Sequence, residues 1–320
     1  MGVAQMPSKA RLEKPMVNPG IPVLAEMLRT RQTKTLAAGI DLIMADLRES
    51  LEATPRPIDT HTHVLVILHE SPRAPRSDEP GFDWIDGAME QRSALRAAET
   101  ATVLANYIRV LGWEAKAHSA TTSDLDLNDV SVAAGLTTVK DAQLAAPWIG
   151  DGFGLAAVST TLELAKDRPL APLDMQPRRE LSGLSWRLGR HSAKSAYTQD
   201  PFASRQFVDG PHPFETLKRV DRPTTYIDEA NVARVPKRAD MFARAQFGDM
   251  GKANQQGATG GHYVRKAASS MALRRLLGAL VFLQDGPPAQ KRADQNPEKT
   301  AQNLRAASYF LGLDAVGTSR

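Results

Sequence analysis

Two short apolar runs, separated by the longest helical pattern in the chain, most restrict what this sequence can fold into. Val64–Leu68 is continuously apolar inside a strand predicted over Ile58–His69, and Ala156–Thr160 lies inside a strand predicted over Phe153–Leu164. Continuous apolar strands suit a sheet that is covered on both faces, because successive side chains point to opposite sides. We therefore predict that both runs belong to one sheet.

The segment Gly87–Leu111 is the clearest helix, and Gly112 stands where a helix terminator is expected. Its apolar stripe is predicted to consist of Leu95, Ala98, Val103, Leu104, Tyr107, Ile108 and Leu111. A short strand over Trp113–Ala117 and a helix over Asp126–Gly135 follow, and two earlier helices are predicted over Ile21–Arg31 and Thr35–Ala53. Alternating strands and helices indicate an α/β layered (α+β) fold.

The second half of the chain differs from the first in composition and periodicity. Residues 171–261 are rich in proline, glycine and arginine and show little periodicity, which predicts an extended arm. Helices are predicted over Tyr263–Leu283 and Pro297–Leu311, and a strand over Leu313–Gly317. We predict an α/β domain over 1–190, an extended linker over 191–261 and the start of a second unit over 262–320.

Composition narrows the functional classes. There is no cysteine, which removes disulfides, thiol nucleophiles and thiolate-held iron–sulphur clusters from this chain. The longest apolar run, Leu276–Leu283, is far shorter than a membrane span, and the N-terminus has no signal-peptide core. Basic residues are spread out and not clustered with aromatics. We expect a cytoplasmic protein that binds neither membrane nor nucleic acid.

The motif Asp59-Thr-His61-Thr-His63 is the most tempting candidate site. A His-x-His pair at the end of a first strand supplies two imidazoles to a divalent metal in amidohydrolases. Here the apolar strand follows the histidines, whereas that motif requires it to precede them. We therefore predict that His61 and His63 are structural and name no metal ligand.

Two glycine clusters invite a phosphate-binding interpretation, Gly150–Gly154 and Gly257–Gly261. The first precedes a strand, whereas a phosphate loop follows a strand and opens a helix. The second precedes the basic, amphipathic helix at Tyr263–Leu283. Turn formation is the simpler interpretation of both clusters, and packing on its own domain is the simpler one for the helix.

A stretch over Ala98–Pro172 resembles reductive dehalogenases, in which a helix ending in a "YIRxLGY"-like turn leads into a strand. An alanine-rich "AAGLG" helix follows in that family, then a strand ending in "TDLPL". The matching residues are Tyr107-Ile108-Arg109, Leu111-Gly112-Trp113, Ala133-Ala134-Gly135-Leu136 and Arg168-Pro169-Leu170. The resemblance implies the cobalamin-binding fold that is related to flavin-dependent nitroreductases.

The sequence departs from the family pattern after Leu170, where the family has two cysteine clusters that bind four-iron four-sulphur centres. A second patch resembles the opening of the family: Arg222–Glu229, Val235–Arg238, Phe242–Gly248 and Ala306–Gly317. An end-like segment is thus followed by a start-like one. We interpret the chain as a degenerate first copy followed by the beginning of a catalytic copy.

The resemblance implies reductive removal of halide from a halogenated aromatic, with cobalamin and two four-iron four-sulphur clusters held in the C-terminal catalytic region, the chain's expected partner. This part would be structural. Tyr107, Tyr197, Tyr226, Tyr263 and Tyr309 stand in no motif that marks a proton donor, so we assign no catalytic, cofactor-binding or metal residue. A stand-alone interaction paralogue, a flavin enzyme of nitroreductase type and a homo-oligomer remain open alternatives.

Overall fold

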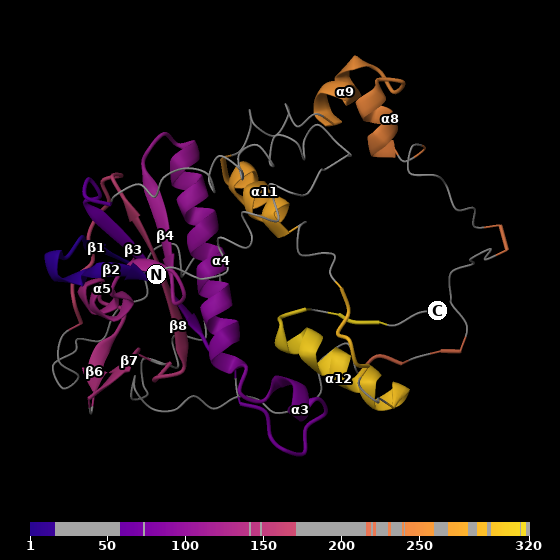
Figure 1. Cartoon of the computed structure of the whole chain (residues 1–320), viewed down its shortest axis with the longest axis horizontal. Helices are drawn as coiled ribbons and strands as arrows, with labels where there is room; N and C mark the ends of the chain where they lie inside the picture. Colours follow the sequence, from indigo (N-terminus) through magenta and orange to yellow (C-terminus); the bar gives the residue numbers. More distant parts are fainter. Residues whose placement is uncertain are drawn as a thin grey trace. The chain divides into compact units, whose positions relative to one another are not determined.

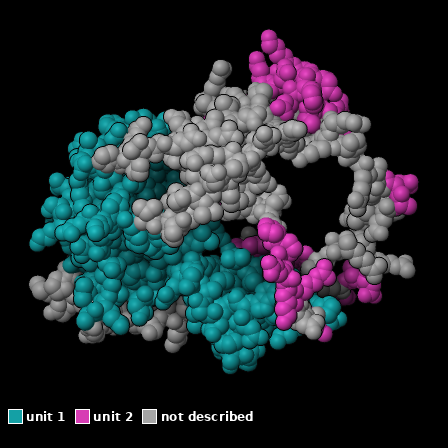
Figure 2. Space-filling view, viewed as in Figure 1, with its two compact units in different colours: residues 1–18, 56–208, 297–311 teal, residues 19–55, 209–296, 312–320 magenta. Residues whose placement is uncertain are grey.

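The computed structural model describes residues 1–16 and 58–170, apart from Arg73, Asp141 and Trp148, together with short stretches between 216 and 317. The helices predicted over 21–31 and 35–53 lie outside the described residues. Two compact units divide the chain: residues 1–18, 56–208 and 297–311 form the first, and 19–55, 209–296 and 312–320 the second (Figure 2).

The first unit is built on a four-stranded antiparallel sheet with the order β1-β3-β8-β4 (Figure 1). Its strands are β1 (Gly2–Gln5), β3 (His63–Glu70), β4 (Ala115–Ser119) and β8 (Phe153–Thr160). The register pairs Val64 with Ser159 and Leu68 with Leu155. The prediction that the two apolar runs share a sheet is confirmed, and the runs are direct neighbours.

The two central strands, β3 and β8, have different bounds from those predicted. Residues 58–60 form a turn before β3, closed by a hydrogen bond of 3.0 Å from the His61 amide to the Ile58 carbonyl. β8 ends at Thr160, and the chain beyond it returns to the free edge of β1, where Val3 and Asp167 exchange hydrogen bonds. The strands predicted over 58–69 and 153–164 are therefore shorter than expected, because tertiary contacts occupy their ends.

Each face of the sheet is covered, as the continuous apolar runs require. Leu65 and Ile67 pack with α4 (Met89–Val110), whereas Val64 and Val66 face α5 (Leu127–Ala133) and the segment around η1 (Ser8–Ala10). Two small sheets, β2 (Arg11–Met16) with β5 (Ser123–Leu125) and β6 (Thr138–Lys140) with β7 (Gln143–Ala145), complete the unit. The predicted α/β layered class is confirmed, with antiparallel sheets.

The predicted apolar stripe of α4 is wrong in most positions. The helix buries Ala97, Ala101 and Ala105 against the sheet, whereas Leu95 and Leu111 are exposed. Small side chains allow the helix backbone to approach the strands closely, as it does at Gly154. A Cβ atom at Gly154 would lie 2.4 Å from the backbone of Ser93 and of Ala94. Of the predicted stripe, only Leu104 and Ile108 pack with this core.

The end of α4 agrees with the predicted cap, and the structure shows a capping residue at the start of α5. Gly112 has a φ of 95°, a left-handed conformation that favours glycine, and it ends α4 as expected. Asp126 precedes α5, and its carboxylate accepts hydrogen bonds from the amides of Asn128 and Asp129. The short strand after Gly112 begins at Ala115, two residues later than predicted.

One helix of the chain's second half packs within the first unit. α12 (Pro297–Phe310) contacts α3 (Phe82–Ile85), where Lys299 and Asp83 form an ion pair at 3.5 Å. The guanidinium of Arg92 lies over the ring of Phe310 at 5.5 Å. The helix predicted over 297–311 is confirmed, but it belongs to the first compact unit, whereas the predicted boundaries placed it in a second one.

The second unit contains three described helices: α8 (Met241–Phe247), α9 (Lys252–Ala258) and α11 (Ala268–Leu280). α11 confirms the described part of the helix predicted over 263–283. α8 and α9 fall in the range predicted as an extended arm, so part of that range is helical. Residues 313 and 315–317 form no strand, so the strand predicted at the chain end is wrong over its described residues. Among the described residues, no helix is long and apolar enough to cross a membrane.

Candidate functional site

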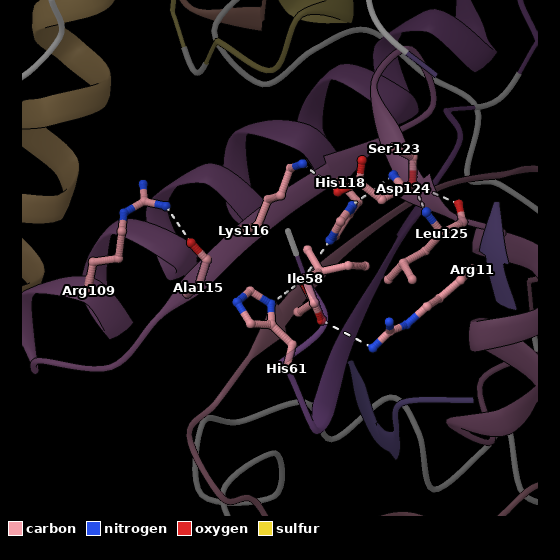
Figure 3. A network of polar contacts seen from close by, with 11 residues as sticks. Arg11, Ile58, His61, Arg109, Ala115, Lys116, His118, Ser123, Asp124 and Leu125 are labelled. Carbon is pink, nitrogen blue, oxygen red and sulfur yellow. Dashed lines mark hydrogen bonds and ion pairs between the residues drawn. The ribbon is translucent and has the colours of Figure 1, made fainter. Parts of the chain in front are cut away.

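A buried network of polar side chains lies on the face of the sheet that α5 covers (Figure 3). Its centre is Ser159 of β8, whose hydroxyl lies 2.7 Å from Nδ1 of His61 and 2.8 Å from Nε2 of His118. His61 precedes β3 and His118 lies in β4, so the network joins two strands of the sheet to the turn before a third. Ser159 is 0% exposed and His118 is 1% exposed.

The hydrogen bonds assign a direction to the network. The Asp124 amide donates to Nδ1 of His118 at 3.2 Å, so this nitrogen is an acceptor and the ring proton is on Nε2. Nε2 of His118 then donates to the Ser159 oxygen. The Ser159 hydroxyl proton is thereby directed towards Nδ1 of His61. A single chain of donors and acceptors runs from Asp124 of β5 to the turn before β3.

Burial keeps both imidazoles neutral. Desolvation lowers the pKa of His118 from 6.5 to about 4, and the neighbouring Asp124 carboxylate opposes this shift only partly. Desolvation also lowers the pKa of His61, with Glu114 acting in the opposite direction. Neutral rings are what the hydrogen-bond directions require, since a protonated His118 has no acceptor at Nδ1.

Charged residues surround the network at the surface. Lys116 forms an ion pair with Asp124, and Arg11 pairs with Asp59 at 2.6 Å and donates to the Ile58 carbonyl at 3.2 Å. The Arg11 contacts join β2 to the turn over residues 58–60, and the Lys116 ion pair joins β4 to β5. With its hydroxyl fully buried and bonded to two rings, Ser159 cannot meet an external substrate. The network therefore positions the turn before β3.

The structure separates the two histidines of the sequence motif. His61 is bonded to Ser159, whereas Nδ1 of His63 lies 2.9 Å from the hydroxyl of its neighbour Thr62. The two rings thus have different partners and share no ligand-binding point. Across the described stretches, no group of three metal-ligating side chains is found. His118 and Ser159 escaped the sequence reasoning: the predicted strand ended at Ala117, two residues before β4 ends, and Ser159 was treated as part of an apolar run.

The first glycine cluster is structural. Gly150 has a φ of 83° and closes a turn with Ala146, and Gly154 allows the close approach of α4. Of the second cluster, Gly257 lies in α9, and residues 259–261 lie outside the described part. Of the five tyrosines, Tyr107 is partly exposed on α4 and Tyr309 lies in α12, and the other three are in segments that the structure does not describe.

Replacing Ser159 with alanine is expected to lower the free energy of unfolding by about 2 kcal/mol, because two buried imidazole nitrogens lose their hydrogen-bond partner. Urea unfolding followed by circular dichroism measures the change. Ser308→Ala is the matched control, since that hydroxyl bonds only a helix carbonyl on exposed α12 and its loss should cost less than about 0.5 kcal/mol. Equal effects of both substitutions would contradict a stabilising network at Ser159.

Searches with protein-family profiles and against curated protein sequences find no match. Solved structures do match, and they are B12-dependent reductive dehalogenases. The catabolic reductive dehalogenase NpRdhA matches with a TM-score of 0.64 and 26% sequence identity, over 96% of this chain and 49% of that chain. A second structure, of the same enzyme in complex with 3-bromo-4-hydroxybenzoic acid, gives 27% identity at the same TM-score.

The resemblance indicated by the motif at 107–113 and its companions is therefore confirmed: the chain is similar in structure to catabolic reductive dehalogenases over nearly all of its length. It spans about half the length of the chains that it matches.

Proposed function

We propose that this chain is the N-terminal, structural portion of a cytoplasmic, cobalamin-dependent reductive dehalogenase that removes halide from halogenated aromatic compounds. The match over 96% of this chain and only 49% of NpRdhA supports the proposal, because it leaves half of a dehalogenase for the catalytic machinery. The layered fold of the first unit would then be a degenerate version of the nitroreductase-like, cobalamin-binding fold.

The residues of this chain do not fit the iron–sulphur centres of such an enzyme. Those clusters are held by cysteine thiolates, and the chain has no cysteine. Nor does the buried network present a free imidazole pair to a cobalt ion, since both nitrogens of His118 are already hydrogen-bonded. Under this proposal, cobalamin and both four-iron four-sulphur clusters are held by the remainder of the dehalogenase polypeptide.

This chain's own contribution is a rigid scaffold. The sheet is covered on both faces, and the network at Ser159 fixes the turn before β3 without requiring a charged group in the core. The proposed partner is the C-terminal catalytic region of the same enzyme. The proposal includes no binding to nucleic acid or to a membrane, and it is compatible with a homo-oligomer.

A chimera tests the proposed function, with this chain replacing the matching stretch of NpRdhA. After loading with hydroxocobalamin and iron–sulphur reconstitution, the chimera is expected to release bromide from 3-bromo-4-hydroxybenzoic acid, whereas the 320-residue chain alone releases none. Ion chromatography measures the bromide. A loaded chimera no faster than free cobalamin would contradict the proposal, as would stoichiometric iron and sulphide in the isolated chain.

A further inference from the structure

The segment over residues 107–113 carries the family resemblance, and the fold explains only part of it. Ile108 is buried against the sheet, and Gly112 supplies the left-handed conformation that ends α4. Arg109 donates from Nη1 to the Ala115 carbonyl at 2.7 Å, which ties the end of the helix to the start of β4. These three residues therefore maintain the helix-to-strand connection.

The remaining large residues of this segment have no such role in the fold. Tyr107 and Val110 are each 36% exposed, Leu111 is 49% exposed and Trp113 is 47% exposed. We call these four residues the outer apolar face. A contiguous exposed apolar patch rich in aromatic side chains is typical of an interaction surface, whereas single exposed apolar residues are ordinary.

Two residues of the outer apolar face, Tyr107 and Val110, lie on the side of α4 that points away from the sheet, whereas Leu111 and Trp113 stand at and beyond the end of the helix. The helix buries Ala97, Ala101 and Ala105, which repeat every four residues. At about 100° per residue, Leu111 lies about 80° around the helix from Ala101, whereas Tyr107 lies about 120° and Val110 about 180° from it. Packing on the sheet therefore does not account for Tyr107 or Val110.

Polypeptide already covers the earlier part of this outward side. The Arg92 guanidinium stacks on the ring of Phe310, and Arg96 donates to the Leu311 carbonyl, both at the C-terminal end of α12. Arg92, Arg96, Val103, Tyr107 and Val110 follow one another at helical spacing. The outer apolar face thus continues the strip on which α12 packs, towards the end of α4.

We propose that the outer apolar face is the docking surface for the half of a reductive dehalogenase polypeptide that this chain does not match. The inference rests on the proposed function, which supplies that partner. Four side chains offer far less than the roughly 800 Å² per partner of a standard interface between separate molecules. A covalently connected partner needs less area, because its effective concentration is high. The size of the face therefore favours the attached half over a second copy.

Hydroxyl-radical footprinting of the NpRdhA chimera and of the 320-residue chain tests the docking surface. Oxidation of Trp113 is expected to be slower in the chimera by about threefold or more, because the ring becomes covered. Trp84 is the internal control: it is 41% exposed on α3, outside the outer apolar face, and should react equally in both proteins.

Leu111→Glu in the chimera should restore Trp113 oxidation to the rate in the isolated chain, because a carboxylate cannot enter an apolar interface without cost. Val139→Glu, at an exposed position of β6, should leave the protection intact. In the isolated chain, both variants should unfold at the same urea concentration as the parent.

The outcomes separate the two proposals. A chimera that releases bromide while Trp113 stays as reactive as in the isolated chain overturns the docking surface alone. Protection of Trp113 without bromide release supports the docking surface and contradicts the proposed function. Protection that appears in the isolated chain as its concentration rises assigns the face to a second copy and overturns the docking proposal, as does a chimera showing neither bromide release nor protection.

Discussion

Replacing Gly154 with alanine is expected to lower the free energy of unfolding by about 3 kcal/mol or more. The added Cβ would lie 2.4 Å from the backbone carbonyl carbon of Ser93 and 2.7 Å from Cα of Ala94. Backbone atoms inside a 22-residue helix cannot rotate away as a side chain can. The methyl group would therefore force α4 away from β8 and loosen the packing of the alanine face on the sheet.

Gly152→Ala is the matched control, two residues earlier in the same segment. A Cβ there would meet only the Cβ of Ser71, at an ordinary 3.7 Å, so stability should change by less than about 1 kcal/mol. Urea unfolding of both variants, followed by circular dichroism, measures the difference. If Gly154→Ala were as stable as Gly152→Ala, α4 would not approach β8 as closely as the structure shows.

The same close approach explains why the sheet could be predicted from sequence but the face of α4 could not. The runs at 64–68 and 156–160 are recognisable because each strand is buried on both sides, and β3 and β8 indeed pair along their full length. In α4, the prediction placed the large apolar residues on the buried face. The face that packs on the sheet consists of alanines, whose small size matters only because the helix lies close to the sheet, as it does where Gly154 meets Ser93 and Ala94.

For the candidate site, too, only part of what the structure shows could be predicted from the sequence. His61 is conspicuous in the sequence, but its local neighbour His63 is not its partner. Ser159 is 98 residues away and His118 is bonded through that serine, so their meeting depends on the strand order of the sheet. No spacing rule links a residue that precedes one strand to residues of two other strands. A strand extended to Ser119 would have placed His118 in the sheet, which is as far as the sequence reaches.

In the second half, local helix signals were reliable and long-range assignments were not. The helix predicted over residues 297–311 was found as α12, and Gly312 follows it with a φ of 93°. Its packing against α3, through Lys299 and Asp83, cannot be read from either segment alone. The expected strand at the chain end rested on composition over five residues, and the described residues 313 and 315–317 do not form it. The missing strand does not count against the alternative that the chain is a stand-alone interaction paralogue. The chimera experiment is what distinguishes that alternative from the dehalogenase proposal.

Acidification is expected to destabilise the fold by about 3 kcal/mol through His118, as the pH falls from 6.5 to 4. Burial lowers the pKa of this imidazole to about 4 in the folded chain, against 6.5 for an ordinary histidine. Between these values the unfolded chain binds a proton that the folded chain does not, which favours unfolding. The contribution to stability is complete above pH 6.5, and it is lost on acidification to about pH 4.

His61 acts in the same direction, because its pKa is also lowered. The charged groups around the two rings are Asp124 and Glu114, which raise the pKa values, and Lys116 and Arg11, which lower them. Desolvation is the largest influence on both histidines. The acid sensitivity should therefore persist at high salt, since screening weakens the contributions of exposed charges and leaves burial unchanged.

His118→Asn tests the assignment, because carboxylates elsewhere also titrate on acidification. The variant should be less stable than the parent near neutral pH, where it lacks the ring's contacts, yet the difference should shrink by about 3 kcal/mol towards pH 4. Urea unfolding of the parent and the variant at a series of pH values measures the difference. Parallel pH profiles for the parent and His118→Asn would show that His118 is protonated equally easily in the folded and unfolded chain, and the neutral hydrogen-bond chain through Ser159 would then be wrong.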